Sequence, residues 1–285
     1  MPEGSAMQPP SASDGSVRDQ FLMIDGLQLH YRDWGSPQNP PVLLLHGAAM
    51  HARTWDHFAA AMTDRFRLLA LDTRGHGESD RSTDYGFERI VSDIEEFADG
   101  LRLDRFALIG NSMGGRHAGL YAARHLNRVE RLVIVESCLN PPLTSDAQSV
   151  LAYFQGLPAS FASVDEALTT YRPLAPRAPD DVLRPWVTDN LREDDDGRLT
   201  WRRDPLVRTQ NINPSWEFTL SLLPDVTCPT LLVCGVDSFT RVDTEATAPM
   251  MQQARAGLVA AAGHFPMLEN PEGFVSVVRP FFLES

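Results

Sequence analysis

The sequence lacks several features that would direct a protein to a membrane, to an oxidising compartment or to nucleic acid. It has no run of roughly 18 apolar residues that could cross a bilayer, and residues 1–19 contain no apolar signal-peptide stretch. Its three cysteines are too few, and odd in number, for a disulfide framework. Lys and Arg number 25 against 38 Asp and Glu, and this net charge of −13 would repel nucleic acid and anionic membranes. The sequence therefore predicts a cytoplasmic protein that binds neither.

What is present fits one large domain with a modest insertion. Hydrophobic residues make up 43% and charged residues 22% of the chain, which are ordinary values for a globular protein. A chain of 285 residues can bury a substantial core. Residues 1–19 are rich in Pro, Ser and Gly, and we expect them to form a disordered tail.

Short apolar runs of strand length recur along the chain, each ending at a Gly or a polar residue. Continuous apolar runs are typical of parallel strands that are buried on both faces. Stretches with helical spacing lie between them, which is the pattern of a doubly wound parallel sheet, and ligands bind such sheets at the carboxyl ends of the strands. A hairpin is predicted ahead of them at Phe21–Trp34. The runs are Val42–Leu45, Leu68–Leu71, Phe106–Ile109, Leu132–Val135, Thr230–Val233 and Leu258–Ala262.

Between residues 140 and 223 this alternation stops. The stretch has no run of strand length, and its helix-like pieces at Asp146–Gly156, Val164–Tyr171 and Asp180–Glu193 are separated by prolines. We interpret residues 140–223 as a helical insertion over the sheet. The sheet domain then comprises residues 20–139 and 224–285.

The segment Gly110-Asn111-Ser112-Met113-Gly114 stands between an apolar run and a helical stretch. A Gly-x-Ser-x-Gly motif in this position is typical of a nucleophile elbow, a sharp strained turn in which the glycines leave room for the serine. A phosphate-binding loop does not fit, because no Lys follows Gly114-Gly115. Ser112 is therefore the candidate nucleophile.

A nucleophilic serine needs a base and a set of donors for the oxyanion. His264 follows the last apolar run, and a histidine there can remove the proton of the serine hydroxyl. The tetrahedral intermediate also needs backbone N–H donors. The candidates are the N–H of Met113, directly after the nucleophile, and the N–H of Ala48, in the loop after Leu45.

These segments resemble the sequential landmarks of the α/β-hydrolase superfamily, and the chain is similar to its capped bacterial members, which include esterases, lactonases and carbon–carbon bond hydrolases. The resemblance implies a mostly parallel eight-stranded sheet flanked by helices, with a helical cap at residues 140–223 inserted after strand 6. It also implies that His76 belongs to a structural turn. The segments that carry it are His46-Gly47-Ala48, Asp72–Asp80, Gly110–Gly115 and Gly263–Pro271.

The acid that would orient His264 departs from the family's pattern. The resemblance places it most often after the seventh strand, where this chain has Ser238 at the expected position and Asp237 one residue early. Parts of the family use a position after the sixth strand, and there this chain has Glu136. Either carboxylate could orient the imidazole and stabilise its charged form. We favour Glu136 and keep Asp237 as the alternative.

The residues together predict a serine hydrolase that cleaves a carboxylic ester or lactone through an acyl-enzyme, without a cofactor. The expected partner is a small molecule with a largely apolar acyl group, because the predicted insertion carries aromatic and aliphatic side chains, Trp186, Trp201 and Trp216 among them. A metal site is not expected, since His46, His51 and His57 lack a recognised ligand spacing. The oligomeric state stays open.

Two alternatives remain. Carbon–carbon hydrolysis of a vinylogous diketone is one, because Asn111 and Met113 at the elbow resemble that subgroup, although its members typically have Trp after the catalytic His and this chain has Phe265. A ligand-binding protein of the same fold without catalytic activity is the other.

Overall fold

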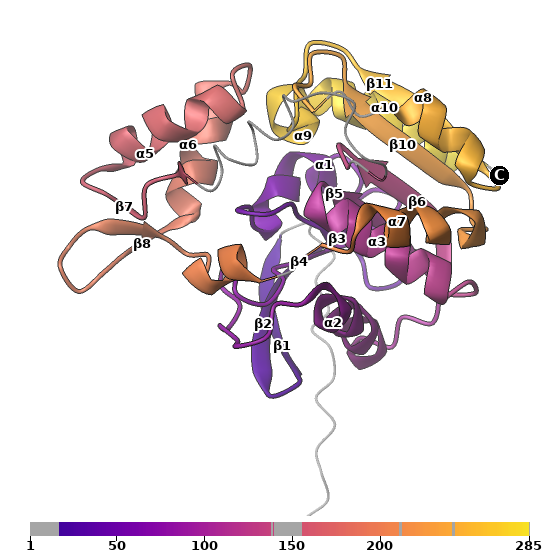
Figure 1. The fold of residues 1–285 in the computed structure, drawn as a ribbon, viewed down its shortest axis with the longest axis horizontal. Helices are drawn as coiled ribbons and strands as arrows, with labels where there is room; N and C mark the ends of the chain where they lie inside the picture. Colours follow the sequence, from indigo (N-terminus) through magenta and orange to yellow (C-terminus); the bar gives the residue numbers. More distant parts are fainter. Residues whose placement is uncertain (1–16, 138, 140–155, 211–212, 241–242, 285) are drawn as a thin grey trace, which may run out of the picture.

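The computed structural model describes residues 17–284 except 138, 140–155, 211–212 and 241–242. Within this part of the chain, eight strands form one sheet in the order β1-β2-β4-β3-β5-β6-β10-β11 (Figure 1). β1 and β2 form the predicted antiparallel hairpin, and β2 pairs antiparallel with β4. All neighbours from β4 to β11 are parallel. The predicted eight-stranded, mostly parallel sheet is confirmed.

The sheet has a hydrophobic core on each face, and alternate residues of each central strand pack into one core or the other. In β3, for example, Val42 and Leu44 join the core on one face of the sheet, and Leu43 and Leu45 join the core on the other. Both faces are apolar because both are covered by helices. The strands are β1 (Arg18–Ile24), β2 (Leu27–Trp34), β3 (Pro41–Leu45), β4 (Arg67–Leu71), β5 (Phe106–Asn111), β6 (Val129–Val135), β10 (Thr230–Gly235) and β11 (Ala254–Val259).

The helices cover the two faces of the sheet. α1 (Asp56–Ala60) and α10 (Pro271–Leu283) pack their aromatic residues on the first face, whereas α2 (Phe87–Gly100) and α3 (Met113–Arg124) pack on the second. The remaining elements of the sheet domain and its borders are short. They are α7 (Trp216–Leu222), α8 (Thr244–Thr247), α9 (Pro266–Glu269) and the 3-10 helices η1 (Ala52–Trp55), η4 (Leu223–Asp225) and η5 (Ala248–Met250).

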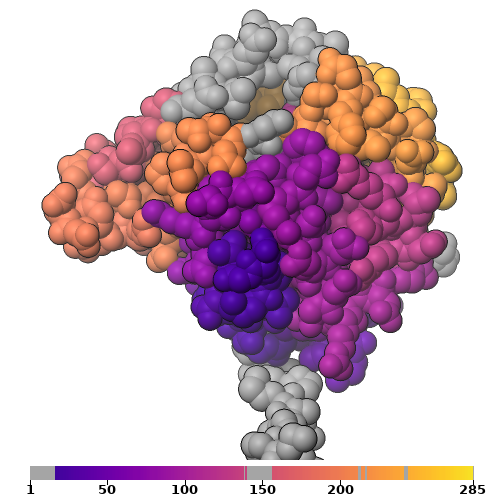
Figure 2. All heavy atoms as spheres, turned by 60° about the horizontal axis from the view of Figure 1, so that its bottom comes forward, coloured from indigo at the N-terminus to yellow at the C-terminus, as the bar shows by residue number. Residues whose placement is uncertain are grey.

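At the end of the predicted insertion α7 packs against α3, whereas residues 156–209 project as a lobe beside the sheet (Figure 1, Figure 2). It holds helices α5 (Val164–Tyr171) and α6 (Asp180–Asp189) and the 3-10 helices η2 (Arg172–Leu174) and η3 (Pro205–Thr209). It also holds a small sheet in the order β7-β9-β8, made of Ser160–Phe161, Leu199–Trp201 and Leu191–Glu193. The predicted helix Asp146–Gly156 lies almost entirely outside the described residues.

The structure differs from the sequence-based expectation in three places. The predicted helix Asp180–Glu193 ends at Asp189, and its last residues form β8, because two- and three-residue strands carry no periodicity to recognise. The last strand was predicted at Leu258–Ala262 but lies at Ala254–Val259, since this edge strand is half exposed and lacks a continuous apolar run. β1 begins at Arg18, within the segment expected to be a disordered tail.

Candidate active site

Ser112 occupies a strained turn between β5 and α3, with φ of 51° and ψ of −111°. A side chain rarely adopts such a backbone conformation, and the surrounding structure has to hold it. The glycines on either side allow a very close approach of backbone: a Cβ on Gly110 would lie 2.2 Å from the carbonyl oxygen of Gly114. The backbone N–H of Ser112 donates to Val135 at 2.8 Å. The turn thus has the geometry of a nucleophile elbow.

The loop that follows β3 lies against this turn. A Cβ on Gly47 would lie 3.3 Å from the Cβ of Ser112 and 2.7 Å from Oδ1 of Asn111, so any larger residue there would displace the loop or the turn. The loop is tight, because the carbonyl of Gly47 accepts a hydrogen bond from Met50 and Ala49 has a φ of 62°. Ala48 therefore lies in a turn beside Ser112. Met113 directly follows Ser112 as the first residue of α3.

Two of the predicted catalytic residues are in direct contact. Nδ1 of His264 lies 3.0 Å from Oε2 of Glu136, and both side chains are buried. Because a carboxylate only accepts hydrogen bonds, Nδ1 must carry the proton that it donates. In the neutral ring the other nitrogen, Nε2, then has a free lone pair. This is the tautomer that a general base for a serine hydroxyl requires.

The carboxylate of Glu136 is held by three further donors, from the last residue of β10 and from the segment that follows it. The backbone N–H of Gly235 donates to Oε1 at 2.6 Å, and the hydroxyls of Ser238 and Thr240 donate to Oε2 at 2.6 and 2.7 Å. Glu136 also has a positive φ of 50°, which a glutamate adopts only when its surroundings fix it. Ser238 was predicted only as a replacement at an acid position, and no pattern in the sequence indicates Thr240. Ser and Thr hydroxyls are too common in loops to signal this role.

The alternative acid, Asp237, lies elsewhere. Its carboxylate forms an ion pair with Arg177 of the insertion at 3.2 Å and is 40% exposed. Its backbone N–H donates to the carbonyl of Ala262 at 2.9 Å. Among the hydrogen bonds of the described residues, His264 therefore reaches Glu136 and not Asp237.

The histidines near the loop after β3 are buried and hold the scaffold. His46 donates from Nδ1 to the carbonyl of Gly47 and accepts the N–H of Thr73 at Nε2. The ring of His76 lies 4.9 Å from that of His46, and burial lowers the pKa of both. Burial likewise lowers the pKa of His51 to about 4, and its Nε2 donates to the carbonyl of Trp186. These contacts tie the loop to the turn after β4 and to α6.

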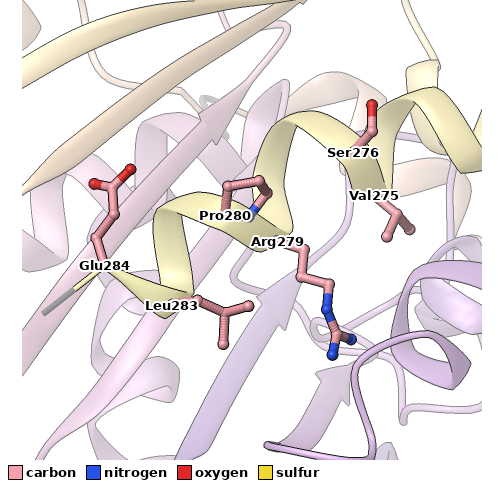
Figure 3. A pocket seen from close by; sticks show the side chains of 6 residues that line it. All are labelled: Val275, Ser276, Arg279, Pro280, Leu283 and Glu284. Atoms are coloured by element: carbon pink, nitrogen blue, oxygen red, sulfur yellow. The ribbon is translucent and has the colours of Figure 1, made fainter.

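Outside these contacts, the described residues form neither a metal site nor a membrane-spanning helix. No group of three or more His, Cys, Asp or Glu side chains lies close enough to hold a metal ion, and no helix is long and apolar enough to cross a bilayer. A shallow depression of about 420 Å³ runs along α10 beside Val275, Arg279 and Leu283 (Figure 3). None of the predicted catalytic residues lines this depression. Of the three cysteines, Cys228 and Cys234 are buried free thiols, and Cys138 lies outside the described residues.

Comparison with known families agrees with this geometry. The model of the alpha/beta hydrolase family matches residues 42–277, which span β3 to α10 and include the elbow, Glu136 and His264. The chain belongs to this family. The resemblance inferred from the sequence landmarks is thereby confirmed.

Two of the similar proteins are hydrolases whose names state different substrates. The chain is 28% identical to the sn-1-specific diacylglycerol lipase ABHD11 of Mus musculus over 87% of its own length and 82% of that protein. It is 27% identical to epoxide hydrolase 3 of Xenopus tropicalis over 91% of its length and 76% of that protein. Among solved structures, E-2-(acetamidomethylene)succinate hydrolase has a TM-score of 0.83 at 22% identity, covering 94% of this chain and 100% of that one. This last likeness shows the fold alone.

Proposed function

We propose that this alpha/beta hydrolase is a serine hydrolase that cleaves a carboxylic ester or lactone through an acyl-enzyme. The single observation that carries the proposal is the hydrogen bond between His264 and Glu136, because it sets the tautomer that leaves Nε2 of His264 free to accept a proton. A family member with a carboxylate nucleophile would use an Asp at the elbow, and this chain has Ser112.

The reaction proceeds in two steps. His264 removes the hydroxyl proton of Ser112 as the oxygen attacks the acyl carbon, and the oxyanion that forms accepts hydrogen bonds from the N–H groups of Ala48 and Met113. His264 then protonates the leaving alcohol, and an acyl-enzyme remains on Ser112. In the second step water, deprotonated by His264, attacks the acyl carbon. The bond from this carbon to Oγ of Ser112 then breaks, His264 returns the proton to Oγ, and the acid is released. Glu136 stabilises the imidazolium in both steps without accepting the proton itself.

Residues 140–223 act as a cap in this proposal. Aromatic rings from the insertion stand next to the catalytic histidine's loop: Tyr171 has its ring centre 6.2 Å from that of Phe265 and 4.7 Å from that of Trp186. The indole of Trp186 also donates to Thr54, in η1 just after the loop that carries Ala48. Apolar side chains in this position favour an acyl group that is largely hydrophobic.

A labelling experiment and a substrate screen test the proposal together. We expect a fluorophosphonate probe to label Ser112 stoichiometrically in the purified chain and to leave the Ser112→Ala variant unlabelled. The same two proteins are assayed on short and long acyl esters, lactones and ring-cleavage diketones. Turnover of esters or lactones that is lost in Ser112→Ala supports the proposal, whereas turnover of the diketones alone would assign carbon–carbon hydrolysis. A folded chain that is neither labelled nor active would be a ligand-binding protein.

A further inference from the structure

Arg203 is a buried cation for which the described residues provide no counter-ion. It lies between β9 and η3 in the insertion and is 7% exposed. No Asp or Glu of the described residues forms an ion pair with its guanidinium, and no carboxylate is among the charges that act on it. The adjacent Asp204 is engaged elsewhere, since it accepts hydrogen bonds from the hydroxyl of Tyr85 at 2.8 Å and the N–H of Leu206 at 2.9 Å.

The backbone around Arg203 is fixed between two loops of the sheet domain. On one side, the side chain of Asn190 donates to the carbonyl of Ala49 at 3.0 Å, and the carbonyl of Asn190 accepts the N–H of Arg202 at 2.9 Å. On the other side, the N–H of Asp204 donates to the carbonyl of Gly75 at 2.8 Å. Arg203 therefore lies next to the loop that carries Ala48 and next to the turn that carries His76.

The polar atoms near Arg203 are also without partners. The hydroxyl of Tyr171 and Nε2 of His76 are both buried and have no hydrogen-bond partner among the described residues. The charge of Arg203 acts on both groups. Tyr171 in turn packs against Phe265, the neighbour of His264. A buried cation and a buried hydroxyl thus lie close enough to act on each other, and the ring that carries the hydroxyl contacts the loop of the catalytic histidine.

Leaving such a cation unpaired is costly. Burial, reinforced by the charge of Arg208, lowers the pKa of Arg203 to about 10, so the guanidinium still carries its charge at neutral pH. A buried charge is retained in proteins when it is paired or when it binds a ligand. A planar guanidinium with several N–H donors matches a carboxylate geometrically.

We propose that Arg203, together with the hydroxyl of Tyr171, binds a carboxylate group that the substrate carries in addition to the bond that is cleaved. This inference rests on the proposed function, because it places the group in the substrate of the Ser112 site. The substrate is then a hemiester of a dicarboxylic acid or an ester of a hydroxy acid, with an apolar portion against Tyr171 and Trp186. In both cases the anion that binds Arg203 is unchanged by the hydrolysis.

Matched pairs of activated esters test this subsite. In the first pair the additional carboxylate is in the acyl part of the ester. The p-nitrophenyl hemiester of glutaric acid is compared with the same ester in which a carboxamide replaces the free carboxylate. In the second pair the additional carboxylate is in the alcohol part. The butyryl ester of p-hydroxybenzoate is compared with the butyryl ester of p-hydroxybenzamide. We expect the parent chain to prefer the carboxylate in one pair by about 10- to 100-fold in kcat/KM. The pair that shows the preference tells which part of the substrate faces Arg203.

Variants assign the preference to this residue. Arg203→Met should bring the ratio of the two kcat/KM values close to one, and Arg203→Lys should retain part of it. Arg184→Met is the matched control, because Arg184 is also an arginine of the insertion but is 52% exposed and pairs with Asp165. No preference in either pair of the parent, or a preference that survives Arg203→Met, would overturn the subsite.

A binding measurement separates this proposal from the proposed function. Calorimetric titration of glutarate, with glutaramide as the neutral control, needs no turnover and is done on the Ser112→Ala chain with and without Arg203→Met. If no ester is hydrolysed and Ser112 is not labelled, the hydrolase proposal fails. Glutarate binding that depends on Arg203 would still support the carboxylate subsite, and equal binding of glutarate and glutaramide would refute it. The parent's own preference is measured even if Arg203→Met does not fold.

Discussion

Glu136 reaches His264 across an intervening strand. Glu136 follows β6, His264 follows β11, and β10 lies between these two strands in the sheet. Neighbouring strands are about 4.8 Å apart, so the ends of β6 and β11 are separated by roughly twice that distance. The longer side chain of a glutamate and the donors above β10, Gly235 and Ser238, suit this span. These donors therefore hold the carboxylate of Glu136 close to the position of an acid that follows β10, which is the more common arrangement in the family.

Glu136→Gln should lower kcat by about a thousandfold or more, because the amide can no longer fix the tautomer of His264 or stabilise its charged form. KM should change little, since Glu136 does not contact the substrate in the proposed mechanism. Steady-state assays on an activated ester measure both constants. Asp237→Asn is the matched control and should cost far less, as Asp237 pairs with Arg177. Equal activity of Glu136→Gln and the parent would remove Glu136 from the mechanism.

Moving the acid from Glu136 to position 238 should recover part of the kcat that Glu136→Gln loses. The hydroxyl of Ser238 lies 2.6 Å from the same carboxylate oxygen that contacts His264. An aspartate at this position would therefore place its carboxylate close to Nδ1. We expect the double variant Glu136→Gln, Ser238→Asp to exceed Glu136→Gln in kcat by about tenfold or more. In the single variant Ser238→Asp two carboxylates would be in contact, and its thermal unfolding temperature should fall. If the double variant is no more active than Glu136→Gln, the geometry does not permit an acid on β10.

Much of this arrangement could be predicted from the sequence, because strong local patterns mark it. The runs at β3, β5 and β6 are continuous apolar segments. The Gly-x-Ser-x-Gly motif around Ser112 predicts the sharp turn, because that turn requires glycines. Glu136 could be named as a candidate because parts of the family that the sequence resembles place the acid after the sixth strand, and Glu136 directly follows that strand.

The rest depends on contacts between distant parts of the chain. Thr240 and Ser238 matter only because they face Glu136, which is more than a hundred residues away. The absence of a counter-ion for Arg203 among the described residues is likewise invisible in the sequence, where Asp204 directly follows it. The short strands β7, β8 and β9 form because their partners are brought together by α5 and α6, and no periodicity within two or three residues could indicate them.

Stability should decrease as the pH falls from about 6.5 towards 4. His51 is fully buried, and its pKa is lowered from 6.5 to about 4. Between these two pH values the unfolded chain binds a proton at His51 and the folded chain does not. One such histidine lowers the free energy of unfolding by up to about 3 kcal/mol once the pH is below both pKa values. Burial lowers the pKa of His46 and His76 in the same direction. The raised pKa of His30 beside Asp72 and that of Asp56, which burial raises to about 6, oppose the effect.

Urea unfolding at pH 7.5 and pH 5 measures this dependence. His51→Gln retains a donor for the carbonyl of Trp186 and removes the titrating ring, so the loss of stability between the two pH values should be smaller than in the parent. His57→Gln is the control, because His57 is exposed. A pH dependence that is the same in all three proteins would show that His51 is not responsible.

Gly47→Ala should abolish most of the activity while leaving the fold intact. The added Cβ would lie 2.7 Å from Oδ1 of Asn111 and 3.3 Å from the Cβ of Ser112, so either the loop after β3 or the elbow has to move. In the proposed mechanism, such a displacement separates the N–H of Ala48 from the oxyanion, and loss of one such donor costs about 100- to 1000-fold in kcat. Gly119→Ala is the matched control: it adds a Cβ in α3 at an ordinary contact distance of 3.5 Å from Ile134, and it favours the helix. Activity and thermal unfolding of both variants are compared with the parent. A fully active Gly47→Ala chain would mean that the oxyanion is bound by groups other than this loop.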